Sequence, residues 1–245
     1  MISRSGEVIR GYGTEALLRS KLWIAAHRPG TAVRCNLCEW TGPRFAERQR
    51  CPRCKSLPRN RLVPFSLSQL GLNISQSTVL HVAANRGEAL YVAAQKPQLH
   101  IRADLRPLDG FNFQGDMCNL GLESGVVDIA IAWHVLEHVP DDALAIEEVA
   151  RVLRPGGAFL MSVPIHPAGN RRTRDDRTVA ATDRESVFGH HDHVRSCGLD
   201  YGDRLAAAGL TVRTLACDQL DGTTLDTLGL SPAHVVWCGT APAGQ

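Results

Sequence analysis

Four cysteines in the first quarter of the chain are spaced like the ligands of a single metal ion. They form two Cys-x2-Cys pairs that are separated by 12 residues. Four thiolates at this spacing favour Zn²⁺ in a tetrahedral site, whereas a redox disulfide would fit either pair alone better than both together. Because four protein ligands leave no position for water, we expect a structural zinc that stabilises a segment too small to fold by burial alone. The expected ligands are Cys35, Cys38, Cys51 and Cys54, on two adjacent β-hairpins.

Acidic residues follow short apolar runs in an order typical of nucleotide binding. A β-branched and apolar strand over residues 78–84 opens into a turn and a helix. The next strand, over residues 99–103, ends in Asp104, where a carboxylate can accept both hydroxyls of a ribose. A further acid, Asp116, suits an adenine amino group, and Met117 is placed to cover the ring face. This order predicts a cleft for the nucleoside part of a cofactor.

Histidines dominate the next motif, in which a buried strand over residues 126–133 runs into His134-x-x-Glu137-His138. Ligands bind at the carboxyl ends of strands in open α/β sheets, so His134 and His138 are candidate general bases or substrate contacts. Alternatively, His134 lines the cofactor and His138 caps or packs a helix. The pattern also occurs in a class of zinc peptidases, although the following Pro140 would interrupt the long helix that a peptidase needs.

A second polar cluster follows an arginine-rich loop. His190, Asp192, His193 and Arg195 crowd one short stretch, and Tyr201 lies close behind them. We expect His193 to be a catalytic base and the other four residues to contact the substrate. Two alternatives stay open: an internal ion pair between Asp192 and Arg195 that fixes the loop, and a third ligand from this cluster to a catalytic metal.

The elements that must position these residues alternate between strand and helix. A crossover helix ends at Leu153, residues 154–157 stop it, and a fifth strand follows. Two more strands, over residues 210–212 and 235–238, close the chain. The alternation predicts an α/β fold with a doubly wound, Rossmann-like sheet and a small N-terminal zinc ribbon.

The string from Gly115 to Pro164 resembles the class I S-adenosylmethionine-dependent methyltransferases. Its most specific parts are Trp-His-Val-Leu-Glu-His-Val at residues 133–139 and Arg-Val-Leu-Arg-Pro-Gly-Gly at residues 151–157. A subgroup with a leading four-cysteine zinc ribbon is similar over residues 33–215, because it shares a stretch like the Phe-Gly-His-His-Asp-His-Val-Arg of residues 188–195. The resemblance implies S-adenosylmethionine as cofactor and an antiparallel hairpin that closes the sheet.

The resemblance also implies which residues bind this cofactor. The chain departs from the family in its first turn, because most members have an acid in place of His81 and glycines in place of Ala83 and Asn85. The expected cofactor-binding residues are His81, Ala83, Ala84, Asn85, Gly87, Asp104, Leu105, Asp116, Met117, Trp133 and His134.

Composition divides the chain into unequal parts. With 245 residues and 44% hydrophobic content, the chain can bury one substantial core and carry a small appendage. We expect a lead-in over residues 1–32, the zinc ribbon over 33–60, a linking helix over 61–75 and the methyltransferase domain over 76–245. Since the sequence shows no membrane-length apolar run and no signal core, we expect a soluble, cytoplasmic protein with no membrane partner.

Charge is also divided unequally. Residues 1–75 hold 13 Lys or Arg against 4 acidic residues, a formal charge of +9, and the remainder carries −7. The basic end would attract a phosphate-bearing partner such as RNA, dock on the acidic part, or merely solvate the ribbon. Arg59 and Arg61, near the start of the linking helix, would face a substrate or tie the two domains together.

Three functions are compatible with these residues. The leading hypothesis is an S-adenosylmethionine-dependent methyltransferase that transfers a methyl group to an oxygen or nitrogen of a small-molecule metabolite. The runner-up is an RNA methyltransferase, similar to ribosomal RNA enzymes, whose basic ribbon binds phosphates. The third is a non-catalytic binding protein, because the first turn lacks the usual glycines.

Overall fold

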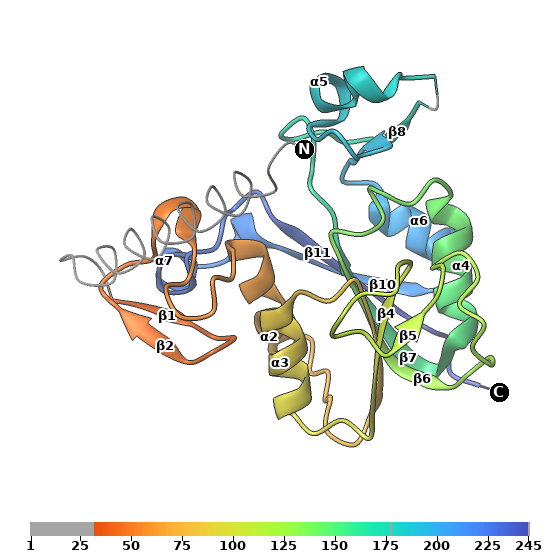
Figure 1. Cartoon of the computed structure of the whole chain (residues 1–245), viewed down its shortest axis with the longest axis horizontal. Helices are drawn as coiled ribbons and strands as arrows, with labels where there is room; N and C mark the ends of the chain where they lie inside the picture. The colour runs from red at the N-terminus through yellow and green to blue at the C-terminus, as the bar shows by residue number, and fades with distance from the viewer. Residues whose placement is uncertain (1–31, 177, 245) are drawn as a thin grey trace, which may run out of the picture.

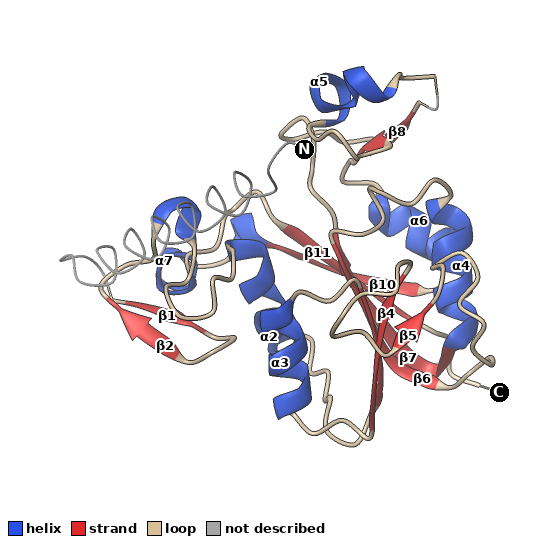
Figure 2. Cartoon of the chain, in the orientation of Figure 1, coloured by secondary structure: helices blue, strands red, loops and turns tan. Residues whose placement is uncertain are grey.

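A seven-stranded sheet forms the centre of the molecule, with helices on both of its faces (Figures 1 and 2). The computed structural model describes residues 32–176 and 178–244, so the expected lead-in up to residue 31 lies outside the described residues. In spatial order the strands are β10 (Thr211–Ala216), β11 (Val235–Thr240), β7 (Leu153–Ser162), β6 (Val127–Trp133), β3 (Thr78–Val82), β4 (Leu99–Asp104) and β5 (Phe113–Gln114). Strands β3 to β7 pair in parallel, and β11 is antiparallel to both neighbours. The doubly wound α/β sheet is therefore confirmed, as is its antiparallel closing pair.

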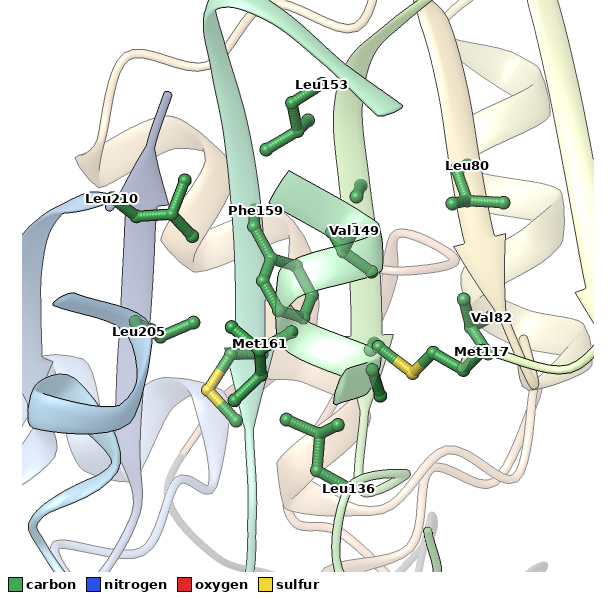
Figure 3. Packing of buried hydrophobic residues seen from close by; sticks show 14 of the residues in the cluster. Leu80, Val82, Met117, Leu136, Val149, Leu153, Phe159, Met161, Leu205 and Leu210 are labelled. Atoms are coloured by element: carbon green, nitrogen blue, oxygen red, sulfur yellow. The ribbon is translucent and has the colours of Figure 1, made fainter. Parts of the chain in front are cut away.

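Two apolar layers hold the sheet between its helices. On one face lie α4 (Asp142–Val152) and α6 (Tyr201–Ala207), and on the other lie α2 (Pro58–Gln69) and α3 (Arg86–Ala94). Figure 3 shows Val149 of α4 beside Phe159 of β7 in the first layer. Burial on both faces explains why the central strands consist almost entirely of apolar residues. None of the helices in the described residues combines the length and apolar character that crossing a bilayer requires.

The connection from α4 to β7 differs from the prediction. Helix α4 begins where the side chain of Asp141 accepts the N–H of Leu144, and it ends at Val152. The Arg-Pro-Gly-Gly segment then belongs to β7, so its assignment as a separate helix stop was wrong. Within this strand the register shifts against β6, and a Cβ on Gly157 would lie 2.9 Å from the carbonyl oxygen of Arg154 and 3.1 Å from that of Val127.

The four-cysteine segment contains one described hairpin, and two were expected. Strands β1 (Val33–Cys35) and β2 (Trp40–Gly42) pair antiparallel and carry the first cysteine pair. The second pair follows the short helix η1 (Glu47–Gln49) in an irregular turn. Figure 1 shows this segment beside α7 (Gly222–Leu228), which follows the short helix η3 (Cys217–Gln219).

A small unit is inserted between β7 and α6. Strand β8 (Arg174–Asp175) pairs antiparallel with β9 (Arg195–Ser196), and η2 (Ala181–Asp183) and α5 (Arg184–Phe188) lie between them in the sequence. In Figure 1, β8 and α5 lie together at one end of the molecule, beyond α6. We call residues 174–196 the insert. It carries the polar cluster that the sequence placed between the fifth strand and the next helix.

Arg61 ties the cysteine segment to the rest of the chain. The residue is 0% exposed, and its guanidinium carbon lies 3.8 Å from the ring centroid of Phe45. Its nitrogens donate hydrogen bonds of 2.6–3.1 Å to the carbonyl oxygens of Gln49, Ser56, Leu228 and Gly229. Arg61 therefore joins the cysteine segment to the rest of the chain, which is one of the two roles considered for it.

Replacing Arg61 with methionine will strongly destabilise the protein. The substitution removes the donors and leaves buried carbonyl oxygens unpaired, each at a cost of about 1–3 kcal/mol. We expect a loss of about 3 kcal/mol or more in the free energy of unfolding, measured by urea denaturation. Arg59→Met is the matched control, because Arg59 lies two residues away on the same helix and is exposed. Equal midpoints for the two variants would contradict the role assigned to Arg61.

Candidate functional site

The turn after β3 is narrow although it lacks glycine. Ala83 has a φ of 49°, in the left-handed region, and its N–H donates to the carbonyl oxygen of Ala103 at 2.8 Å. Asn85 then caps α3, its side-chain oxygen accepting the N–H of Gly87 at 2.9 Å. Ala84 lies between these two anchors. The chain thus forms a tight strand-to-helix turn with Ala83 and Asn85 at the two positions where the resemblance expects glycine.

A buried carboxylate lies under this turn. The Oε1 atom of Glu88 accepts a hydrogen bond from Nδ2 of Asn60 at 2.7 Å, and its Oε2 accepts the N–H of Asn85 at 3.2 Å. The Nε2 atom of the buried His81 is 3.6 Å from the same Oε2. Glu88 therefore places an acid beside the strand position where the resemblance expects one. The sequence analysis missed this residue, although the spacing of Asn85 and Glu88 is that of a capping box.

Asp104 and Asp116 lie on neighbouring segments. The carbonyl oxygen of Asp104 accepts the N–H of Gly115 at 3.0 Å, which joins the end of β4 to the residue before Asp116. The carboxylate of Asp104 is largely buried and accepts the N–H of Arg106 at 2.9 Å. That of Asp116 accepts the N–H of Cys118 at 2.9 Å. The structure thus joins the segments that carry the two acids proposed to hold an adenosyl group.

The two apolar candidates at this edge differ in exposure. The side chain of Leu105 is open, since the residue is 65% exposed. Met117 is only 4% exposed, and its side chain packs beside Val82 in the core (Figure 3). Leu105 is free to cover a ring face, whereas Met117 mainly supports the end of β3.

His134 stands directly after β6 in a fixed conformation. Its φ is 56°, its N–H donates to the carbonyl oxygen of Ser162 at 2.9 Å, and its Nδ1 lies 3.3 Å from Oε1 of Glu137. Several buried atoms near the ends of β3 and β6 have no hydrogen-bond partner among the described residues. They include both ring nitrogens of His81, Nε1 of Trp133, Nε2 of His134 and Oε2 of Glu137. Because each unpaired buried polar atom costs about 1–3 kcal/mol, this edge fits a polar ligand that would pair with them.

The insert brings a second set of histidines to the turn after β6. The rings of His138 and His193 meet edge to face with their centroids 4.9 Å apart, and the rings of His190 and His193 are 5.1 Å apart. Asp192 bonds Nδ1 of His190, and its Oδ1 lies 3.4 Å from Nδ1 of His138. His134, His138 and His193, the three proposed catalytic residues, therefore lie on two segments that meet around Glu137.

Burial affects the protonation of two histidines near this group. Desolvation lowers the pKa of His193, although a hydrogen bond to the carbonyl oxygen of Phe188 and the charge of Glu137 oppose it. Burial also lowers the pKa of His234 to about 4, with smaller contributions from the neighbouring His134 and Arg59. The imidazole of His234 is therefore neutral at pH 7. His234 immediately precedes β11, and no local sequence pattern marked it as a neighbour of His134.

Arg195 and Tyr201, two of the expected substrate contacts, are buried against acidic partners. Arg195 is 2% exposed, and its guanidinium reaches Asp142 and Asp175. It also donates to the carbonyl oxygens of Leu136, Val139 and Pro140. The hydroxyl of Tyr201, which is fully buried, donates to Asp142 at 2.9 Å. Both residues therefore stabilise the loops around the site.

The four expected metal ligands converge. The Sγ atoms of Cys35 and Cys54 are 3.6 Å apart, as are those of Cys38 and Cys51. All four sulfurs lie within 4.8 Å of one another, and none forms a disulfide. Sulfurs bound to one Zn²⁺ at about 2.3 Å in a tetrahedron are about 3.8 Å apart, so the cluster fits this ion.

The central part of the chain is similar to known methyltransferases. Residues 66–161 match the family described as a methyltransferase domain. A probable S-adenosylmethionine-dependent methyltransferase of Mycolicibacterium smegmatis is 34% identical over 95 residues, which are 39% of this chain and 29% of that protein. The matched region thus spans about a third of the length of such curated relatives.

Two solved structures share the fold. An S-adenosylmethionine-dependent methyltransferase from Mesorhizobium loti superposes with a TM-score of 0.53 at 15% identity, over 71% of this chain and 95% of that one. The [4+2]-cyclase SpnF superposes with a TM-score of 0.51 at 15% identity, over 76% of this chain and 81% of that one. At these identities the likeness concerns the fold alone, which does not determine the reaction. Together, these comparisons show that residues 66–161 are similar to methyltransferase domains and that the sheet has the fold of S-adenosylmethionine-dependent methyltransferases.

Proposed function

We propose that this chain binds S-adenosylmethionine and transfers its methyl group to an oxygen or nitrogen of a small molecule. The observation that carries the proposal is the joining of the Asp104 and Asp116 segments at the edge where buried polar atoms of His81, Trp133 and His134 lack partners. A ligand with ribose hydroxyls, an adenine amino group and a charged amino-acid end would satisfy such atoms.

Each group at this edge has a proposed part in binding the cofactor. Asp104 accepts hydrogen bonds from the ribose hydroxyls, and Asp116 accepts one from the adenine amino group. Leu105 covers a face of the adenine ring. The turn from Ala83 to Gly87 passes close to the ligand, and His81, Trp133 and His134 line its methionine end. The bound cofactor supplies a methyl group that its sulfonium already activates. The protein's part is then to orient the acceptor and exclude water.

The histidine group favours an acceptor that arrives with a proton. A hydroxyl or amine must lose its proton as the new bond forms, and a neutral imidazole within reach can take it. His134, His138 and His193 are the proposed bases, while His190 and Asp192, on the insert, are the proposed substrate contacts. Part of the basic charge around the cysteines has a structural role, because Arg50, Arg53 and Arg61 donate hydrogen bonds to carbonyl oxygens.

Release of S-adenosylhomocysteine tests the acceptor class. We expect turnover when the protein is supplied with small hydroxyl or amine compounds, with little dependence on salt. Turnover on RNA that falls steeply between 50 and 200 mM salt would overturn the small-acceptor proposal, since phosphate contacts release counterions. A folded protein that binds no S-adenosylmethionine would instead support the non-catalytic alternative.

Replacing Asp104 with asparagine will weaken cofactor binding. The substitution keeps the side chain's size and an oxygen for the N–H of Arg106, but removes the charge that strengthens hydrogen bonds to the ribose. A hydrogen bond to a charged group contributes about 1.5–3 kcal/mol, so we expect the Kd for S-adenosylmethionine to rise at least tenfold. Isothermal titration measures this change. Asp109→Asn is the matched control, because Asp109 is exposed in the loop that follows Asp104; similar effects of both substitutions would refute the ribose assignment.

We further propose that Cys35, Cys38, Cys51 and Cys54 bind a structural zinc. Chelation should unfold residues 33–60 before the sheet, because the ion would replace a core that this segment lacks. We expect the four thiols to become reactive towards a thiol reagent, and trypsin to cleave near Arg53 and Lys55, while the sheet stays protected. Cys51→Ser should reproduce this state, whereas Cys238→Ser, a buried cysteine of β11, should not. A segment that stays protected after metal loss would contradict the proposal.

A further inference from the structure

Glu137 is buried in a way that the methyltransferase fold alone does not explain. The residue is 1% exposed, and its Oε2 has no hydrogen-bond partner among the described residues. Its Oε1 is 3.3 Å from Nδ1 of His134 and 3.8 Å from Nε2 of His138. A carboxylate removed from water needs a counter-charge and partners for both oxygens. One oxygen of this buried carboxylate is therefore left without a partner among the described residues.

His138 and His193, beside Glu137, each have an oxygen atom close to Nδ1, as metal-binding histidines usually do. Nδ1 of His193 is 3.1 Å from the carbonyl oxygen of Phe188, so it carries the proton and leaves Nε2 as an acceptor. Nδ1 of His138 faces Asp192, at 3.3 Å from its carbonyl oxygen and 3.4 Å from its Oδ1, which turns Nε2 towards Glu137. Oxygen acceptors behind the distal nitrogens are the usual second layer of a histidine metal site.

The three side chains can reach one ion. One oxygen of Glu137 and one ring nitrogen each of His138 and His193 lie within 4.8 Å of one another. Ligands bound at about 2.0–2.2 Å are about 3–4 Å apart, so small side-chain rotations bring the three onto one ion. One carboxylate and two imidazoles on one side of an ion, with the remaining positions open, is a ligand set for Zn²⁺, Fe²⁺, Co²⁺ or Mn²⁺.

We propose that Glu137, His138 and His193 form a second metal site, which binds a divalent transition-metal ion between the turn after β6 and the insert. The site is separate from the four-thiolate cluster and differs from it in ligand chemistry. Its open positions suit an oxygen donor, so the acceptor would be a molecule whose hydroxyl or carboxylate oxygen can bind the ion. An acceptor hydroxyl bound to the cation loses its proton more readily, which leaves His134 as the base that removes it.

This inference extends the proposed function, but binding of the ion does not depend on it. The ligands come from the turn after β6 and from the insert, whereas Asp104 and Asp116 lie on the segments after β4 and β5. A failure of cofactor binding and a failure of metal binding are therefore separable. The Asp104→Asn variant should lose affinity for S-adenosylmethionine and keep its affinity for the ion.

Titration of the full chain with Co²⁺ tests the site, after the four-cysteine cluster has been filled with Zn²⁺. We expect one equivalent of Co²⁺ to bind, with the zinc retained in metal analysis. His193→Gln should weaken Co²⁺ binding at least tenfold, and Asp192→Asn by about tenfold as an outer-layer partner. His166→Gln is the matched control, because His166 packs against Gly189 of the same insert and is not a proposed ligand. Its Co²⁺ affinity should be unchanged.

Three results would overturn the proposal. The first is no binding of Co²⁺ to the zinc-filled wild-type chain. The second is equal affinity in wild type and His193→Gln. The third is loss of binding in His191→Gln without loss in His193→Gln, which would place the ion on the exposed cluster of His190, His191 and Asp192. Glu137→Gln supplies a second test of the ligand set, and circular dichroism checks that it folds; if it does not, His138→Gln replaces it.

Discussion

The parallel pairing of β3 with both β4 and β6 is the constraint on which the rest of the structure depends. Val82, the last residue of β3, is opposite Ala103 of β4 and Ala132 of β6. Three chain segments that are far apart in the sequence must therefore leave the sheet at the same level. Asp104 and Trp133 each follow one of these paired alanines directly, so register alone places their segments at a common edge. A shift of one residue in either ladder would turn every side chain of that strand to the other face.

Charge at this edge is supplied by local and distant residues together. His81 occupies a strand position where most family members have an acid, yet Glu88 brings a carboxylate to within 3.6 Å of its ring. The same carboxylate accepts a hydrogen bond from Asn60 of α2, the helix that follows the four cysteines. The turn at the proposed cofactor site is thereby connected to the cysteine segment. This contact explains how a first turn without glycines can still be held in one conformation.

Sequence patterns predicted those features that depend on neighbouring residues. Apolar and β-branched stretches indicated β3, β4, β6 and β7, and cysteine spacing indicated a cluster that the structure brings together. Features that depend on distant partners were missed or misassigned. Arg195 looked like a loop residue available to a substrate, but its acidic partners Asp142 and Asp175 lie 53 and 20 residues earlier. The proximity of His234 to His134 likewise follows from strand order, which no local pattern encodes.

Arg195, the first residue of the short strand β9, positions the polar centre from the side of the insert. Its guanidinium fixes the carbonyl oxygens of Leu136, Val139 and Pro140, which belong to the turn that carries Glu137 and His138. Two residues before it in the chain stands His193. One buried cation therefore sets the spacing between two segments more than 50 residues apart, and its charge is balanced by Asp142 and Asp175. A site that binds a ligand must hold its groups to within about half an ångström, and packed, fully hydrogen-bonded supports achieve this. Together with the hydrogen bond from the N–H of Val194 to the carbonyl oxygen of Glu137, Arg195 fixes the residues proposed to bind and to react relative to one another.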